Sequence, residues 1–253
     1  MDAASLVRGT PPGTIVHLLP EWCTPAEEAY LLGRATRAGE ATRGGWTQLS
    51  GRRLQNHGGA PHEKGMIPTP MPDWLLPQIA KAQETCGALM PAAINHVLVN
   101  EYRPGEGIDA HRDGPLYHPA VCIVSLGCDC VMRFAPDPTT AAPDPDPDAD
   151  PDHEAEAEAH HPAPFDVWLP RRSALLFAGD AYERFLHGID AVDVHEAGPR
   201  CANGDALVAA RAAEADDAPD DRGRRRLRVE RKETRVSLTF RSVKRVRKAL
   251  RLG

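Results

Sequence analysis

The chain has 253 residues, 42% of them hydrophobic, and a formal net charge of -6. These values fit one large domain or two small ones. No stretch approaches the roughly 20 apolar residues of a membrane span, and the N-terminus lacks the apolar core of a signal peptide. The six cysteines form no CxxC pair, so their spacing supports neither a disulfide framework nor a zinc site. We expect a monomer with reduced thiols in the cytoplasm or the nucleus, not at a membrane.

The charges are segregated along the chain. Residues 137–158 are rich in Asp, Glu and Pro, whereas residues 222–251 are rich in Arg and Lys. A uniformly acidic protein would repel nucleic acid, but an acidic segment combined with a basic one leaves nucleic-acid binding open. The basic segment has two interpretations, a contact with a phosphate backbone or an ordinary solvated helix.

The first elements expected along the chain are a strand and a helix. Residues 1–13 are predicted to be a flexible tail, and residues 14–19 (TIVHLL) the first strand. Thr24 and Glu27, with a proline between them, fit a capping box. A helix should therefore begin here and run to about Arg37. The side chains expected on its inward face are Ala29, Leu32 and Ala35.

A hairpin and a second helix should follow. Residues 46–57 (WTQLSGRRLQNH) fit two short strands around a serine–glycine turn. Residues 60–72 are rich in proline and irregular. The next helix is expected over residues 74–86, with an early break at Pro77.

From residue 94 onward the pattern changes to short strands separated by turn residues. We expect strands over residues 94–102, 121–126, 131–134, 165–169, 173–177, about 182–189, and 234–241. Two polar, low-complexity segments, at about 136–164 and 197–223, cannot bury apolar surface and are predicted to be disordered insertions. Deleting residues 137–160 should leave the melting temperature nearly unchanged. Residues 246–253 are predicted to be a basic C-terminal tail.

Many short strands with two small helices near the front favour a mainly β fold, an antiparallel barrel or jelly roll. Strands lie on both sides of each insertion, so the insertions do not separate independent cores. We therefore predict a single domain over residues 14–245.

A metal site is indicated by His111 and Asp113, which form an H-x-D triplet after a strand. Residues two apart on a strand point to the same side, so an imidazole and a carboxylate can reach a common point. A distant histidine would complete the facial triad, with open positions, that suits non-haem iron(II). The alternative is a His and an Asp in a surface loop, because chance alone gives about one such triplet in this composition. The flanking glycines and prolines favour a shaped functional loop.

His187 is the best candidate for the third ligand. It is a polar residue within the otherwise apolar run from Phe185 to Ile189. A core histidine bonded to the backbone is the alternative. Four other histidines are less suitable because they lie within or beside the two insertions: His153, His160, His161 and His195.

The strand over residues 235–241 (RVSLTFR) alternates strictly between an apolar and a polar face. Arg235 and Arg241 stand at its ends, about 20 Å apart at about 3.3 Å per residue. Reaching inward, their planar guanidinium groups would leave a gap of about 7 Å that fits a five-carbon dicarboxylate. A solvated outer face is the alternative. Asn100 and Tyr102, two apart on another strand, can offer an amide and a hydroxyl to the same carboxylates.

Taken together, these motifs resemble the AlkB family of dioxygenases, in particular the branch of the sixth AlkB homologue. The runs that carry the resemblance are WTQLSGRRLQNHGG, NHVLVNEYRPGEGI, HRDGPLYHPAV and RVSLTFRSV. It covers about residues 14–245 apart from the two insertions. Each motif is weak alone, but their order and joint presence are specific. One departure is Ser237, where many AlkB enzymes carry a longer asparagine; co-substrate binding should survive but be weaker.

The resemblance implies a double-stranded β-helix, a jelly roll with iron(II) at one mouth. It implies three iron ligands, His111, Asp113 and His187. It also implies that 2-oxoglutarate, which is consumed together with O2, contacts Asn100, Tyr102, Arg235, Ser237 and Arg241. In the implied reaction, 2-oxoglutarate is converted to succinate and carbon dioxide while an N-methyl group is hydroxylated and lost as formaldehyde.

The substrate is expected to be an N-alkylated base of DNA or RNA, taken from a single strand or flipped out of a duplex. By resemblance, the hairpin at residues 46–57 would be a lid over it, with substrate contacts from Trp46, Arg52, Arg53, Gln55, Asn56 and His57. For Trp46, core packing is the alternative to base stacking. Two other functions stay open: demethylation or hydroxylation of a protein side chain, and a nucleic-acid-binding module with little turnover.

Overall fold

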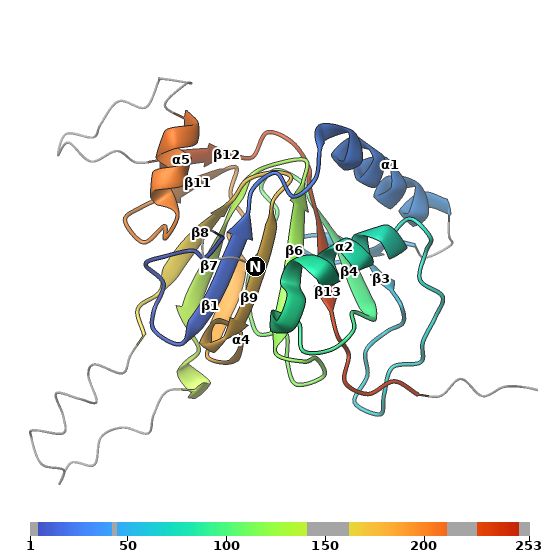
Figure 1. The fold of residues 1–253 in the computed structure, drawn as a ribbon. Coiled ribbons are helices and arrows are strands. Elements are labelled where there is room, and N and C mark those ends of the chain that lie inside the picture. Colours follow the sequence, from blue (N-terminus) through green and yellow to red (C-terminus); the bar gives the residue numbers. More distant parts are fainter. Residues whose placement is uncertain (1–4, 42–44, 141–161, 212–226, 248–253) are drawn as a thin grey trace, which may run out of the picture.

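Two β-sheets packed face to face form the core of the protein (Figure 1). The computed structural model describes residues 5–41, 45–140, 162–211 and 227–247. The larger sheet contains, in spatial order, β1 (Thr14–Leu19), β9 (Ala174–Gly179), β6 (Ala120–Leu126), β13 (Arg235–Arg241), β4 (His96–Tyr102), β3 (Arg53–His57) and β2 (Thr47–Gln48). The smaller sheet contains β5 (Ile108–His111), β10 (Phe185–Ile189), β7 (Cys130–Pro136) and β8 (Phe165–Leu169). Neighbouring strands are antiparallel throughout both sheets, which confirms the predicted jelly roll.

The space between the sheets is filled by alternate side chains of their strands. Successive side chains of a strand point to opposite faces, so β6 contributes Val121 and Ile123 to this inner layer and Cys122 and Val124 to the outer face. All seven residues of β6 are buried, because both faces of the larger sheet are covered. The inner layer also contains a group of aromatic rings: Phe134, Phe165, Phe177 and Phe185.

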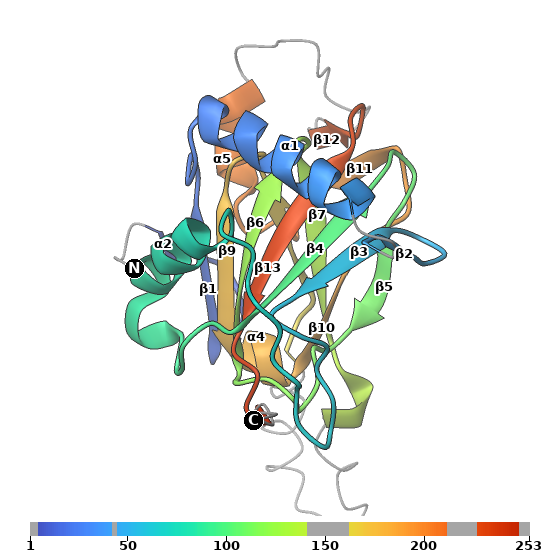
Figure 2. The same cartoon turned by 90° about the vertical axis from the view of Figure 1, so that its right-hand side faces the viewer.

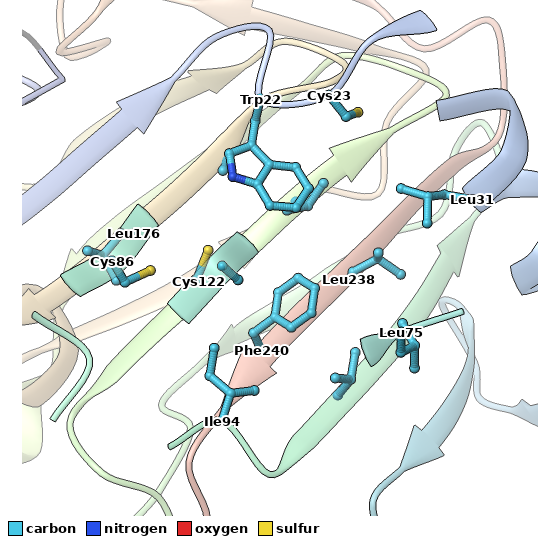
Figure 3. Packing of buried hydrophobic residues seen from close by; sticks show 14 of the residues in the cluster. Trp22, Cys23, Leu31, Leu75, Cys86, Ile94, Cys122, Leu176, Leu238 and Phe240 are labelled. Carbon is cyan, nitrogen blue, oxygen red and sulfur yellow. The ribbon is translucent and has the colours of Figure 1, made fainter. Parts of the chain in front are cut away.

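Two helices, α1 (Pro25–Ala41) and α2 (Leu76–Cys86), cover the outer face of the larger sheet (Figure 2). Leu31 of α1 and Cys86 of α2 pack with Leu238 and Phe240 of β13 in a second buried cluster (Figure 3). Each helix therefore contributes one apolar stripe to a single core, as expected of helices that pack on a sheet.

The start of α1 is the predicted capping box. The N–H of Glu27 donates to Thr24 Oγ1 at 3.2 Å, and the N–H of Thr24 donates to Glu27 Oε2 at 2.7 Å. The predicted inward face was wrong at Ala29, which is exposed, while Glu28 is buried in its place. Leu32 and Ala35 do face the core. A buried glutamate is invisible to a search for apolar periodicity.

The second half of the fold contains two further corrections. α2 begins at Leu76, so Pro77 lies in its first turn, where proline fits, and does not break it. The strand expected over residues 182–189 is divided into the short helix α4 (Asp180–Glu183) and β10. None of the helices in the described ranges has the length and apolarity needed to cross a bilayer.

The segment before β1 is packed from Ser5 onward and is not the expected loose tail. Val7 is buried in the inner layer, and its N–H donates to the carbonyl of Val16 at 2.9 Å. The N–H of Leu18 donates to the carbonyl of Ser5 at 2.8 Å. Residues 1–4 of the predicted tail lie outside the described residues.

Part of the second predicted insertion is folded. β11 (Val194–Ala197) pairs with β12 (Leu227–Glu230), and α5 (Gly204–Arg211) packs against β8 and β12. Together they bury a third apolar cluster on the outer face of the smaller sheet: Val131, Trp168, Ala197, Cys201, Leu207 and Val229. The prediction of disorder was therefore wrong for residues 198–211, and residues 212–226 lie outside the described part.

The first predicted insertion begins later than expected. β7 continues to Pro136, and the short 3-10 helix η2 (Pro138–Thr140) follows it. Asp137 is buried between them and pairs with Arg112 Nε at 2.7 Å. The deletion of residues 137–160 would also remove this contact. Residues 141–161 lie outside the described residues.

We predict that Glu28→Ala lowers the free energy of unfolding at pH 7 by about 2 kcal/mol. The N–H of Gly127 donates to Glu28 Oε1 at 2.8 Å, and Arg171 Nη2 donates to Oε2 at 2.7 Å, so the substitution removes the acceptor of both. The estimate is moderate because Arg171 is 42% exposed and regains water. Urea denaturation measures the change, and Ala29→Gln on the exposed face of α1 is the matched control.

This contribution should depend on pH. Burial raises the pKa of Glu28, but hydrogen bonds from Arg171 and Gly127 outweigh it and hold the pKa below its usual value. The stabilisation is therefore complete above the unfolded-state pKa of about 4.3 and is lost as the pH falls through the lower folded-state pKa. Equal stability of Glu28→Ala and the parent chain at pH 7 would contradict this role.

Candidate active site

The three predicted metal ligands meet between the two sheets. β5 and β10 are neighbours in the smaller sheet, with His111 opposite His187 in the register, and the two ring centroids lie 4.5 Å apart. Asp113 lies two residues beyond the end of β5. Within the described residues, one potential ligand atom from each of the three lies within 4.8 Å of the others. The spacing of the H-x-D triplet therefore brings its two side chains to the distant histidine.

His187 has the environment of a neutral ligand. Its side chain is buried against Phe134 and Phe177. Burial lowers the pKa of His187 to about 3, although the nearby Asp113 carboxylate raises it. The imidazole is therefore neutral at physiological pH and keeps a nitrogen lone pair, which is the form that binds metals.

His111 is oriented by its own strand. Its Nδ1 lies 2.8 Å from the backbone carbonyl oxygen of Asp109. This contact suits an Nδ1–H donor and leaves Nε2 with its lone pair. Metal-binding histidines commonly have such a partner, which sets the tautomer and the ring orientation.

Asp113 is held by Arg241 from the larger sheet. Arg241 Nε donates to Asp113 Oδ2 at 2.8 Å, and Nη2 donates to Oδ1. Both side chains are buried, with exposed fractions of 3% for Asp113 and 9% for Arg241. Burial alone raises the pKa of Asp113, but the charge and the hydrogen bonds of Arg241 oppose it, and the pKa lies below its usual value. The carboxylate is therefore ionised, as a metal ligand must be.

The polar face of β13 lies opposite the group of His111, Asp113 and His187 and lines the same cavity. β13 places Arg235 beside Tyr102 and Ser237 beside Asn100. The cavity is lined by all of the predicted 2-oxoglutarate contacts, together with two of the predicted metal ligands: Asn100, Tyr102, Arg235, Ser237, Arg241, His111 and His187. The structure thus brings this predicted set together around one space.

Arg235 is a buried cation with little to compensate its charge. It is 1% exposed, its Nη2 donates to Ser125 Oγ at 2.9 Å, and its guanidinium lies 5.5 Å from the centre of the Tyr102 ring. Its Nε has no hydrogen-bond partner, and no carboxylate pairs with it in the described ranges. A buried guanidinium without an anion is costly. The residues present therefore fit a carboxylate-bearing ligand in this cavity.

The two arginines of β13 have different partners, contrary to the simple picture of a clamp at both ends of a dicarboxylate. Arg241 already pairs with Asp113, whereas Arg235 has no acidic partner among the described residues. Arg241 therefore holds the carboxylate of Asp113, a predicted metal ligand, and Arg235 is the guanidinium that lines the cavity without an acidic partner.

The hairpin residues divide between two faces of the sheet. Arg52 lines the cavity and its Nε donates to Asn100 Oδ1 at 3.1 Å. Asn56 faces the same side, with its Oδ1 3.2 Å from His96 Nε2. These two are the predicted lid residues that the structure places on the side of the metal cluster.

The other predicted lid residues point toward the helices. Arg53 pairs with Glu101 at 2.7 Å and covers the Trp46 ring. Gln55 is buried, and its Nε2 donates to a carbonyl of α1 at 2.9 Å. His57 packs edge-on against the ring of Trp74. The register of β3 on β4 alternates the two sides, so the structure does not bring these four side chains to the cavity.

Arg231 lies in the basic segment 222–251 and was not predicted to have a role in the site. Arg231 is 1% exposed. Its guanidinium donates to the carbonyl of Glu106 and to those of Arg103 at 3.2 Å and Val192 at 3.4 Å. It thus ties the turn before β5 to the segment after β10, the two strands that carry His111 and His187. Among the many basic residues of this segment, nothing in the sequence distinguishes Arg231 as buried.

A family model described as the 2OG-Fe(II) oxygenase superfamily matches residues 16–241. The chain belongs to this superfamily. Its members use iron(II), 2-oxoglutarate and O2, which agrees with the His–Asp–His cluster beside an arginine that has no acidic partner among the described residues.

Individual relatives of this 2OG-Fe(II) oxygenase confirm the resemblance to the AlkB family. The Danio rerio protein named "Probable RNA/DNA demethylase ALKBH6" is 40% identical over 187 residues, covering 74% of this chain and 73% of the relative. Uncharacterized protein L905 of Acanthamoeba polyphaga mimivirus is 26% identical over 182 residues, covering 70% and 71%. The solved structure of OsALKBH1 shares the fold, with a TM-score of 0.51 and 15% identity over 91% of this chain and 98% of that one.

We predict that Gly188→Ala weakens metal binding. A Cβ at this position would lie 2.9 Å from the carbonyl oxygen of Ile108 and 3.0 Å from the backbone nitrogen of Ala110, so β5 and β10 would have to separate and move His111 away from His187. We expect the dissociation constant for Mn(II), measured by electron paramagnetic resonance, to rise about 10- to 100-fold, the range typical of a disturbed outer shell.

Gly198→Ala is the matched control for this prediction, because nothing lies within 4 Å of a Cβ at that position. It should bind Mn(II) like the parent chain. Unchanged Mn(II) affinity in Gly188→Ala would show that the close approach of β5 and β10 does not set the geometry of the site.

Proposed function

We propose that this 2OG-Fe(II) oxygenase removes alkyl groups from nitrogen atoms of DNA or RNA bases, acting on single strands or on bases flipped from a duplex. The oxygenase chemistry is supported by one observation above all, the cluster of His111, Asp113 and His187 beside a cavity that Arg235 also lines. The substrate class is supported by the relative named as an RNA/DNA demethylase, which aligns over 74% of this chain.

In this proposal, His111, Asp113 and His187 hold iron(II), with a histidine–histidine–carboxylate set typical of non-haem iron. Bound iron(II), 2-oxoglutarate and O2 supply the oxidising chemistry, and succinate, carbon dioxide and formaldehyde are the products. Arg241 keeps Asp113 ionised and oriented, since it bonds both oxygens of that carboxylate.

The co-substrate is proposed to present a carboxylate to Arg235. The free Nε of Arg235 is one donor, and the Tyr102 hydroxyl and the Asn100 amide line the same cavity. Ser237 lies between Asn100 and Ser125 in the sheet register and can add a hydroxyl. Charge-assisted hydrogen bonds to a carboxylate are stronger than neutral ones, so Arg235 should dominate this recognition.

Apart from Arg52 and Thr239, the remaining walls of the cavity are apolar and limit the access of water to the reacting groups. They are formed by Leu98, Ile108, Ile123, Met132 and Ile189. Such walls strengthen the electrostatic contacts inside and limit side reactions of an oxidant with water. The cavity is therefore suited to the oxidation of a substrate group that is brought next to the three proposed ligands.

His187→Ala should abolish turnover. We expect succinate formation from 2-oxoglutarate and iron(II) to fall by more than about 100-fold, beyond the 10- to 100-fold loss typical of an outer-shell residue. His195→Ala is the matched control, since His195 is also buried but lies in β11, outside the cavity, and it should retain most of the turnover.

The substrate class needs a separate readout. Mass spectrometry should detect demethylation, with release of formaldehyde, in a panel of methylated single-stranded oligonucleotides and not in methylated peptides. Demethylation of the peptides and of none of the oligonucleotides would show that the substrate is a protein. A parent chain that forms no succinate with any member of the panel would favour a binding module.

Arg235→Gln and Arg241→Gln should have different effects. A charged hydrogen bond contributes about 1.5 to 3 kcal/mol, so we expect Arg235→Gln to raise the KM for 2-oxoglutarate roughly 10- to 100-fold and to leave Mn(II) binding nearly unchanged. Arg241→Gln should weaken Mn(II) binding as well, because Asp113 loses its partner. Kinetic titration and Mn(II) binding measure the two effects, and identical profiles of the two variants would contradict the division of roles.

A further inference from the structure

A group of basic side chains, here called the basic strip, lies along the segment that follows β13. It consists of Lys64, Lys244, Arg245 and Arg247. This segment lies at the end of the sheet opposite α1 (Figures 1 and 2). The predicted basic tail is therefore ordered at residues 246 and 247, the first of which forms a bridge with Met66.

Backbone hydrogen bonds fix the strip between two loops. The N–H of Lys244 donates to the carbonyl of Leu116 at 3.0 Å, on one side. On the other side, the N–H of Met66 donates to the carbonyl of Arg245, and the N–H of Arg247 donates to the carbonyl of Met66, both at 2.8 Å. The four charged side chains therefore project from an ordered backbone.

The side chains of the strip contact backbone carbonyls. Lys244 Nζ donates to the carbonyl of Pro115 at 3.2 Å, Arg245 Nη1 to that of Glu63 at 3.3 Å, and Arg247 Nε to that of Lys64 at 3.0 Å. In the parts of the chain that the structure describes, no carboxylate pairs with any of the four, although arginines elsewhere do have such partners. Carbonyl contacts position these cations without neutralising them.

Lys244 of the strip also lines a cavity beside Asp113, one of the three predicted metal ligands. This cavity has a volume of about 580 Å³ and its lining includes Lys244, Tyr117, Tyr182 and Gly114. Gly114 directly follows Asp113, and its carbonyl accepts a hydrogen bond from the Tyr182 hydroxyl at 3.3 Å. The Tyr117 ring lies 4.9 Å from the guanidinium of Arg241. The volume is that of a site for a small organic group, and its aromatic walls suit a planar one.

We propose that the backbone of a single-stranded nucleic acid lies along the basic strip and places one base in the tyrosine-lined cavity beside Asp113. The proposal rests on the proposed function and specifies how its substrate binds. A row of uncompensated cations next to an aromatic cavity is the combination that binds phosphates and unstacked bases. The exposed side chains of Ile67 and Val246 beside these cations add apolar contact area, which an acidic peptide would not need.

This surface differs from the hairpin that the sequence predicted as the substrate lid. Arg53, Gln55 and His57 point to the helices and are engaged there. The basic strip, in contrast, is exposed and borders a cavity that reaches the residue after a metal ligand. The geometry therefore favours the strip as the track for the substrate backbone.

The test measures binding of an unmodified single-stranded 15-mer oligonucleotide by fluorescence anisotropy between 50 and 200 mM KCl. For single strands, each phosphate contact contributes about -0.7 to the slope of log K against log salt. We expect Lys244→Gln/Arg247→Gln to bind more weakly and with a slope shallower by about 1.4, as for two lost contacts. The control Arg34→Gln/Arg37→Gln removes the same charge from α1 and should match the parent chain.

The proposal would be overturned by equal affinity and slope for Lys244→Gln/Arg247→Gln and the parent, by equal losses in the α1 control, or by no binding of the parent at 50 mM KCl. Competition by polyglutamate as strong as that by the oligonucleotide would also overturn it, in favour of an acidic protein partner. Binding is read without turnover, so a chain that binds through the strip but demethylates no base would contradict only the proposed function. Undiminished demethylation by the strip variant would contradict only the strip.

Discussion

The ion pair between Asp113 and Arg241 joins the two sheets at the point where the site is built. Arg241 ends the central strand of the larger sheet, and Asp113 follows β5 of the smaller one. Both side chains are almost fully buried, and removal of one partner of such a pair typically costs about 3 to 5 kcal/mol. The contact that closes the sheets on each other thus also sets where the Asp113 carboxylate stands relative to His111 and His187. Both the stability of the fold and the arrangement of the three predicted ligands therefore depend on these two side chains.

Much of the site could be predicted because it follows from strand alternation. His111 and Asp113 share a side by their spacing, and Arg235, Ser237 and Arg241 share a face of one strand for the same reason. The sequence does not show which partner each group meets across the cavity, because register between distant strands is a property of the whole fold. The pairing of Arg241 with Asp113, and the isolation of Arg235, became visible only in the structure.

Other features could not be predicted because local patterns do not determine them. Residues 53–57 are polar on both faces, so alternation does not say which face is inside; the register on β4 decides it. In α1 the buried position belongs to Glu28, whose carboxylate is satisfied by a backbone N–H and Arg171. Residues 198–211 are mostly small residues with few large apolar ones, yet Cys201 and Leu207 pack with Trp168 in one buried cluster.

Arg231 and Arg235 show how a buried charge can distinguish structure from function. Both are 1% exposed, and in both the Nε lacks a partner among the described residues. The Nη groups of Arg231 donate to several backbone carbonyls of two segments, so its desolvation is offset within the fold. Arg235 has a single side-chain acceptor, Ser125, and faces the cavity beside the metal cluster. A buried guanidinium without an anionic partner destabilises the folded protein when no ligand is bound. The cost is offset once an anion binds, which is the physical argument for a carboxylate-bearing co-substrate at Arg235.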